Sequence, residues 1–226
     1  ISTTERLIDN SKQQKKALMQ QLLTGRKRLL DDSGKPFEGK WEEVKLSNIA
    51  NIIMGSSPKS SAYNEDSNGL PLLQGNADIK NRKSSPRIYT SEITKQCQHG
   101  DILLSVRAPV GTVAKSRHKA CIGRGISAIK AKDKHSQEFI YQWLLRFEPM
   151  WEKYSQGSTF EAVNSNDIKS LSLAIPPLPE QQKISSVLTN ADQEIELLEK
   201  QLADLKQEKK ALMQQLLTGK RRVSIN

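Results

Sequence analysis

The sequence predicts an α+β fold in which one mixed, β-rich globular domain is flanked by two long helices. Two observations carry this prediction: a repeated helical segment lies near each end of the chain, and short strand-like patterns fill the region between the copies. The length of 226 residues leaves room for one ordinary domain besides the helices. An apolar content of 36% and a mean hydropathy of −0.60 agree with extended, solvated helices outside the core.

The repeat is the strongest signal in the sequence. Segments 12–29 and 206–223 read KQQKKALMQQLLTGRKRL and KQEKKALMQQLLTGKRRV, and fourteen of eighteen positions are identical at an offset of 194. This spacing excludes a solenoid, whose repeats are typically about 20–50 residues long. We therefore interpret the segments as two copies of one helical element that flanks a different domain.

Apolar residues near the C-terminal end recur every 3.5 residues on average, which is the period of a coiled coil. The helix is expected to run from Pro179 to Thr218, and its predicted seam consists of Leu188, Ile195, Leu198, Leu202, Leu205, Lys209, Leu212 and Leu216. The N-terminal helix has a poorer seam, formed by Ile8, Lys15, Leu18 and Leu22, so it needs a partner. The equivalent lysines Lys15 and Lys209 either select the register at a cost in stability or extend their charges to solvent.

Each copy ends in Thr-Gly followed by a basic triplet, 26–28 and 220–222. Glycine supplies the left-handed residue that closes a helix, and cations there favour the negative end of the helix dipole. We therefore interpret the triplets as helix-end residues in preference to phosphate contacts. Pro179 suits the first turn of the second helix, and Glu180 suits its positive end.

Positive charge is concentrated between Lys80 and Lys132. This segment holds twelve Lys and Arg residues against Glu92 and Asp101, so its local excess equals the net charge of +10 for the whole chain. Such clustering is typical of a surface that binds nucleic-acid phosphates, because each neutralised phosphate releases counterions. A solvated basic surface is the alternative.

Between about Trp41 and Ile175 the pattern is short and mixed, as in a β-rich domain. Strands are predicted at 41–46, 70–74, 101–107, 111–114 and 125–129, with a short helix or turn at 47–53. Segment 137–151 predicts an amphipathic helix with Phe139, Trp143 and Phe147 on one face. Helical spacing points such aromatic residues towards the core.

Several motifs, in their order along the chain, resemble the target-recognition half of type I restriction–modification specificity subunits. They are Trp41–Leu46 with Gly55-Ser56-Ser57-Pro58, Gly100–Ser105 with Gly111, Gly157-Ser158-Thr159 ahead of Asn164 and Ile168, and Pro176–Ile184. The resemblance covers nearly the whole chain. It implies that the two helices pack as an antiparallel coiled coil, that the domain reads half of a bipartite double-stranded DNA target, and that methyltransferase (modification) subunits dock on the assembly.

The resemblance also implies a domain organisation. We expect a coiled-coil helix at 1–25, a linker at 26–40, a target-recognition domain at 41–178, a second coiled-coil helix at 179–219 and a basic tail at 220–226. Only one recognition domain is present, and the chain opens at Ile1 within a helical pattern, which suggests a fragment or a processed product. A half-sized chain could restore the two-domain arrangement as a homodimer.

Direct readout of DNA needs side chains that form paired hydrogen bonds with base edges, namely Arg or Lys to guanine and Asn or Gln to adenine. The candidates in and near the basic segment are Gln74, Asn76, Arg82, Lys83, Arg87, Arg107, Lys115, Arg117, Lys119 and Arg124. The expected phosphate or backbone contacts are Lys59, Lys80, Ser158, Thr159 and Asn164.

The sequence argues against an enzyme. It lacks the Asn/Asp-Pro-Pro-aromatic motif of adenine methylation and a phosphate-binding GKS or GKT, and its histidines lack metal-ligand spacing. We expect no catalytic residue, metal or cofactor here; S-adenosylmethionine, ATP and Mg belong to partner subunits, with the restriction/translocase subunit an indirect partner. Cys97 and Cys121 are expected as reduced thiols in a cytoplasmic protein. The alternatives are a coiled-coil structural or adaptor protein with a basic surface and an enzyme with an unfamiliar active site.

Overall fold

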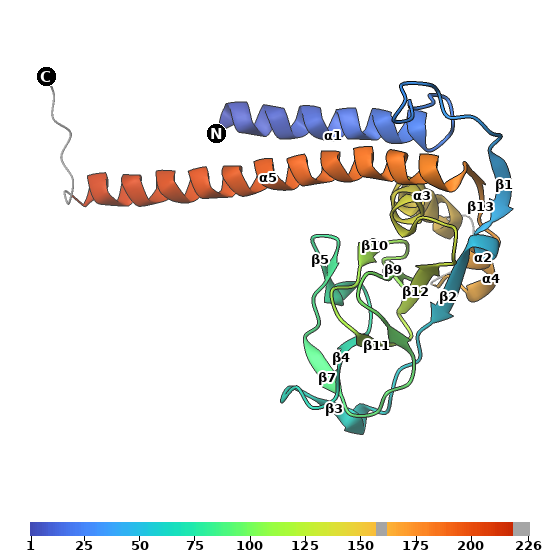
Figure 1. Cartoon of the computed structure of the whole chain (residues 1–226). Helices are drawn as coiled ribbons and strands as arrows, with labels where there is room; N and C mark the ends of the chain where they lie inside the picture. The colour runs from blue at the N-terminus through green and yellow to red at the C-terminus, as the bar shows by residue number, and fades with distance from the viewer. Residues whose placement is uncertain (157–161, 219–226) are drawn as a thin grey trace, which may run out of the picture.

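The computed structural model describes residues 1–156 and 162–218. Helix α1 (Ser2–Leu22) and helix α5 (Leu178–Leu217) run antiparallel as a long arm, and the β-rich domain lies against one end of that arm (Figure 1). The predicted α+β fold with two long, paired helices is therefore confirmed. Because α5 has 40 residues and α1 has 21, the end of α5 extends beyond the start of α1 (Figure 1).

Ion pairs fix the antiparallel register of the arm. Lys12 lies 2.6 Å from Glu199, Lys206 lies 2.8 Å from Glu5, and Lys15 pairs with Asp192. The Lys15 side chain is only 12% exposed, so it is satisfied inside the seam by a carboxylate and does not extend to solvent. This outcome favours a role in register for Lys15.

The predicted seam residues have very different environments along the arm. Those close to the domain are buried: Ile8, Leu22, Leu188 and Ile195. Leu18, Leu198, Leu202 and Leu205 are half-buried, and Lys209, Leu212 and Leu216 are exposed. The last group lies where α5 has no partner helix within the described residues (Figure 1).

The domain contains two mixed sheets. The six-stranded sheet has the order β2 (Ala50–Met54), β12 (Ile126–Ala131), β9 (Ile102–Ser105), β10 (Val113–Lys115), β6 (Lys83–Ser84) and β5 (Ile79–Lys80). The five-stranded sheet has the order β3 (Tyr63–Asn64), β7 (Ile88–Thr90), β4 (Leu70–Leu73), β11 (Ala120–Ile122) and β8 (Gln96–Cys97). The second sheet lies farther from the arm than the first (Figure 1).

A separate pair of strands joins the entry and exit of the domain. Strand β1 (Glu42–Lys45) pairs antiparallel with β13 (Ser172–Ile175), close to the short helices α2 (Leu46–Ile49) and α4 (Ser165–Lys169). The predicted helix or turn at 47–53 was wrong beyond Ile49. From Ala50 the chain is extended because β2 pairs with β12 along five residues.

Helix α3 (Gln137–Gln156) lies between the arm and the six-stranded sheet. Its residues Phe139 and Trp143 are buried, and Phe147 stacks on Trp143 with ring centroids 5.2 Å apart, so the aromatic face belongs to the core as predicted. Leu22 and Leu23, from the first repeat copy, are buried in the same cluster. The arm and the domain therefore share one hydrophobic core.

Arg28 has a role that neither interpretation of the basic triplet anticipated. Its Nε and Nη2 atoms donate hydrogen bonds to the two carboxylate oxygens of Glu180 at 2.6 and 2.8 Å, and Nη1 donates to the Gly39 carbonyl at 3.2 Å. Glu180 is fully buried at the start of α5. Gly25 adopts the expected left-handed conformation with φ of +70° and lies against the Trp41 ring.

Arg28→Met is expected to lower the free energy of unfolding by about 3 kcal/mol, because it leaves a carboxylate buried without its cation. Lys183→Met is the matched control: its ion pair with Asp32 is exposed, so its loss should cost less than about 1 kcal/mol. Urea unfolding measures both values. Equal losses in the two variants would contradict the role assigned to Arg28.

Candidate nucleic-acid interface

A Gly-Arg-Gly turn between β11 and β12 presents one arginine at the surface. The Gly123 and Gly125 amides donate hydrogen bonds to the carbonyls of Leu73 and Gln74 at 2.8 and 3.1 Å. A Cβ added to Gly125 would lie 2.2 Å from the Gln74 carbonyl oxygen, so only glycine allows this approach. The turn is pressed against the end of β4, and Arg124 at its apex is exposed.

This turn forms one wall of a surface pocket of about 530 Å³. The pocket is lined by Ser57, Pro58, Ser60, Tyr63, Gln74, Arg107, Arg124 and Gly125. Three of the predicted base-reading residues, Gln74, Arg107 and Arg124, are thus brought together although they are far apart in sequence. Their side chains form no hydrogen bond or ion pair with another residue in the described parts of the chain, and no carboxylate lines the pocket. The arrangement offers an amide and two guanidinium groups to a ligand.

A buried carboxylate supports the Gln74 side of the pocket. Asp78 accepts hydrogen bonds from the backbone amides of Gln74 and Gly75 at 2.7 and 3.3 Å, and Arg87 Nε lies 2.9 Å from its second oxygen. Arg87 is therefore occupied within the chain and holds the loop that carries Gln74. The adjacent short 3-10 helix (Asn76–Asp78) carries the half-buried Asn76.

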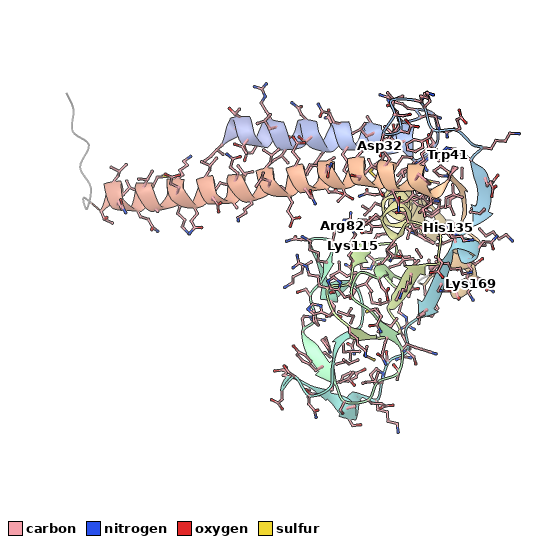
Figure 2. The ribbon with its side chains drawn as sticks, in the orientation of Figure 1. Asp32, Trp41, Arg82, Lys115, His135 and Lys169 are labelled. Carbon is pink, nitrogen blue, oxygen red and sulfur yellow. The ribbon has the colours of Figure 1, made fainter. Side chains whose placement is uncertain are left out.

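A second group of predicted cations is paired with acidic residues of the helices. Arg82 lies 2.6 Å from Glu148 of α3, and Lys83 lies 2.6 Å from Glu196 of α5. Arg82 occupies the left-handed turn between β5 and β6, and it lies under the arm close to Lys115 (Figure 2). The hydrogen bond from Lys83, followed by the charge of Lys83, holds the pKa of Glu196 below its ordinary value.

Lys115 also bridges the sheet and a helix. Its ammonium group pairs with Glu138 and lies 4.4 Å from the centroid of the Tyr141 ring. These contacts attach β10 to α3 at the junction of domain and arm. Together with the Arg82 and Lys83 pairs, they set the direction in which the domain projects.

The structure does not bring all remaining candidates to the pocket. The exposed cations Lys59, Lys80, Arg117 and Lys119 have no side-chain ion pair within residues 1–156 and 162–218. Asn164 caps α4 by accepting from the amides of Asn166 and Asp167. Ser158, Thr159 and the basic tail 220–226 lie outside the described residues.

Three polar side chains that line the pocket were not among the predicted site residues: Ser57, Ser60 and Tyr63. Ser57 Oγ accepts a hydrogen bond from the Arg124 amide at 3.2 Å, and the Tyr63 hydroxyl donates to the Pro58 carbonyl at 3.2 Å. The Gly55-Ser56-Ser57-Pro58 loop was visible as a motif. Its side of the pocket depends on contact with a turn more than sixty residues away, which local patterns do not show.

The described residues contain no group of three or more His, Cys, Asp or Glu side chains able to hold a metal ion. His118 Nδ1 instead forms a hydrogen bond of 2.8 Å with Ser84. Within residues 1–156 and 162–218, no helix is both long enough and apolar enough to cross a membrane.

The sequence between residues 38 and 207 matches the family model described as "Type I restriction modification DNA specificity domain". The chain belongs to this family. The family description specifies DNA specificity and no chemical reaction, in agreement with the expected absence of catalytic function. The resemblance seen in the sequence motifs is therefore confirmed over three-quarters of the chain.

Relatives match this specificity domain over only part of their length. The chain is 41% identical over 186 residues to a specificity subunit assigned to the type I restriction enzyme MjaX of Methanocaldococcus jannaschii, an alignment covering 81% of this chain and 44% of the relative. The HsdS subunit from Thermoanaerobacter tengcongensis is 29% identical with a TM-score of 0.73, covering 95% of this chain and 52% of that structure.

A solved structure described in terms of complex assembly and conformational transition of the type I R-M system is 34% identical, with a TM-score of 0.73 and coverage of 93% and 52%. The chain thus spans about half the length of the relatives it matches. One recognition domain and two helix segments correspond to half of such a subunit.

Gly125→Ala is expected to lower stability by about 2 kcal/mol, because the new methyl group overlaps the Gln74 carbonyl. Gly75→Ala is the matched control: a Cβ there meets no atom within 4 Å, and the change should stay within about 0.5 kcal/mol of the parent. Thermal unfolding of both variants checks this. A neutral Gly125→Ala would show that the turn does not press on β4.

Proposed function

We propose that this chain recognises one half of a bipartite double-stranded DNA target as part of a type I restriction–modification complex. The observation that carries this proposal is the pocket in which Gln74, Arg107 and Arg124 meet and whose lining contains no carboxylate. A glutamine amide matches the paired donor and acceptor of adenine, and a guanidinium group matches the two acceptors of guanine. We assign base reading to these three side chains.

The other predicted cations fall into two groups, according to whether a carboxylate of the chain pairs with them. Lys59, Lys80, Arg117 and Lys119 are exposed and unpaired within the described residues, and we assign them to phosphate contacts that position the duplex. Arg82, Lys83, Arg87 and Lys115 are already engaged by carboxylates of the chain. We assign these four mainly to orientation of the domain, although DNA phosphate can compete for the exposed ones.

We further propose the division of the chain into helix 1–25, linker 26–40, recognition domain 41–178, helix 179–219 and basic tail 220–226. Methylation and cleavage, with S-adenosylmethionine, ATP and Mg, belong in this proposal to modification and restriction subunits in the cytoplasm. The relative whose structure concerns assembly of the type I system supports docking of such subunits. A purely structural coiled-coil protein would leave the acid-free pocket without a purpose.

We also propose that two copies of the chain form the working unit. One copy supplies one recognition domain, whereas the relatives are about twice as long. The end of α5 presents Leu212, Met213, Leu216 and Leu217 to solvent, with exposed fractions of 37%, 50%, 43% and 82%. A second copy would cover this apolar face and supply the second domain, as a symmetric dimer requires.

DNA binding tests the assigned base readers. On a duplex selected from a randomised pool, Arg124→Ala should weaken binding about tenfold to a hundredfold and relax the preference at one base pair. Lys169→Ala, which removes an exposed cation of α4 outside the pocket, should change affinity less than about twofold. Fluorescence anisotropy at several salt concentrations gives both values. Equal losses in the two variants would argue against readout in the pocket.

Assembly with the modification subunit is tested separately. The chain is expected to co-elute with a type I methyltransferase subunit and the selected duplex in size-exclusion chromatography with light scattering. Association depends on docking and not on base readout, so Arg124→Ala should still bind the methyltransferase subunit when DNA is absent. Failure of the parent chain to associate would contradict the assignment to a methylating complex.

A further inference from the structure

The two repeat copies have opposite environments. Residues Leu18, Met19, Leu22 and Leu23 of the first copy pack on the core of the domain, with Leu22 and Leu23 buried. Their equivalents at the offset of 194 are Leu212, Met213, Leu216 and Leu217, which are exposed at the free end of α5. Within residues 1–156 and 162–218, one sequence is thus part of the core at one end of the chain and exposed at the other.

The ion pairs of the arm show why the copies can exchange. Glu5 and Lys12 of α1 are equivalent to Glu199 and Lys206 of α5, again at the offset of 194. The pairs Lys12–Glu199 and Glu5–Lys206 are therefore one Glu–Lys interaction used twice. A second α5 placed antiparallel on the first would preserve this interaction in both directions, from Glu199 of each helix to Lys206 of the other.

The third arm contact obeys the same rule. Lys15, which pairs with Asp192, is equivalent to Lys209, which is exposed and has no partner in the described residues. Two antiparallel α5 helices would place each Lys209 beside Asp192 of the other helix. The charges of α5 are thus complementary to a second copy of α5.

We infer that α1 occupies, within its own chain, the surface on which the end of α5 from a second copy docks, so that dimerisation proceeds by exchange of α1 for α5. This inference rests on the two-copy unit proposed above. It specifies the surface, the antiparallel orientation and the segment that must leave.

The difference in stability between the α1–α5 and α5–α5 pairings comes from the positions at which the two copies differ. Segments 15–25 and 209–219 are identical, so burying one while releasing the other is close to neutral. In the seam before them, α1 presents Thr4, Ile8 and Ser11, whereas α5 presents Leu198, Leu202 and Leu205. Leucine buries more apolar surface than threonine or serine, so α5 forms the better seam.

The advantage of α1 is its attachment. As part of the same chain it acts at a high effective concentration, whereas a second α5 must be supplied by free chains. The exchange therefore depends on chain concentration: α1 prevails in dilute solution, and the better seam of α5 prevails when copies are abundant.

A single cysteine near the symmetry axis distinguishes this dimer from others. The axis lies midway between positions 199 and 206, at half-buried Leu202 and exposed Ala203. Leu202→Cys should form a covalent dimer on mild oxidation, because the two thiols face each other across the axis. Ala203→Cys, at an exposed position, is the matched control and should form little covalent dimer. The native Cys97 and Cys121 are buried, and burial raises the pKa of Cys97, so they should not compete.

The seam positions test the balance. Thr4→Leu with Ser11→Leu gives α1 the leucines of α5, and the dissociation constant of the dimer, measured by sedimentation equilibrium, should rise at least about tenfold. Thr3→Leu with Asn10→Leu places leucines at neighbouring exposed positions and should leave that constant unchanged. Equal effects of the two double variants would overturn the exchange.

The remaining outcomes separate the inference from the proposals above. A dimer seen by light scattering in which Leu202→Cys does not cross-link would overturn the exchange but leave the two-copy unit standing. A chain that remains monomeric at every concentration would overturn both. DNA readout is measured independently through Arg124.

Discussion

The structure depends on burial of the end of α1 in the core of the domain. Leu22 and Leu23 lie in the same cluster as Phe139 of α3 and Ile102 of β9, so the arm is not attached by a flexible linker. Because interiors are close-packed, the direction of the arm cannot change without opening this cluster. The distance between a recognition domain and anything docked farther along the arm is consequently fixed by helix length, at about 1.5 Å per residue.

Charged contacts add direction to this apolar attachment. The Arg28–Glu180 pair joins the segment after α1 to the start of α5. The Lys83–Glu196 pair joins the six-stranded sheet to the same helix, about one turn beyond Asp192, which accepts a hydrogen bond from Gln142 of α3. Exposed ion pairs contribute little stability singly. Their contribution here is geometric, since they hold a small domain at a defined angle to a long helix.

Much of the architecture could be predicted because it follows from the local periodicity of apolar residues. The helices, the seam and the aromatic face of α3 follow from the spacing of apolar residues, and the repeat revealed that one element occurs twice. The pairing of β1 with β13 could not be predicted in this way, because it joins strands more than 120 residues apart. Nor could the ion pairs that engage Arg82, Lys83, Arg87 and Lys115 within the chain.

The Gly123-Arg124-Gly125 turn shows where local reasoning ends. As a sequence it is too short for a phosphate-binding loop, and its importance lies in what it touches. Only in the fold do the two glycines press against β4 and fix Arg124 beside Gln74 and Arg107. A rigid turn loses little conformational freedom on binding, so a guanidinium held in this way presents a better defined geometry to a ligand than one on a mobile loop.

The two repeat copies show a different limit of prediction from sequence, because identical residues have different environments in the fold. In the first copy Lys15 is paired with Asp192, and Leu22 and Leu23 are buried. The equivalent Lys209, Leu216 and Leu217 in the second copy are exposed. Propensity cannot distinguish the copies, since their sequences are the same. The difference is set by the contacts that each copy makes: the first packs on the core of the domain, whereas the second lies on the part of α5 that extends beyond α1.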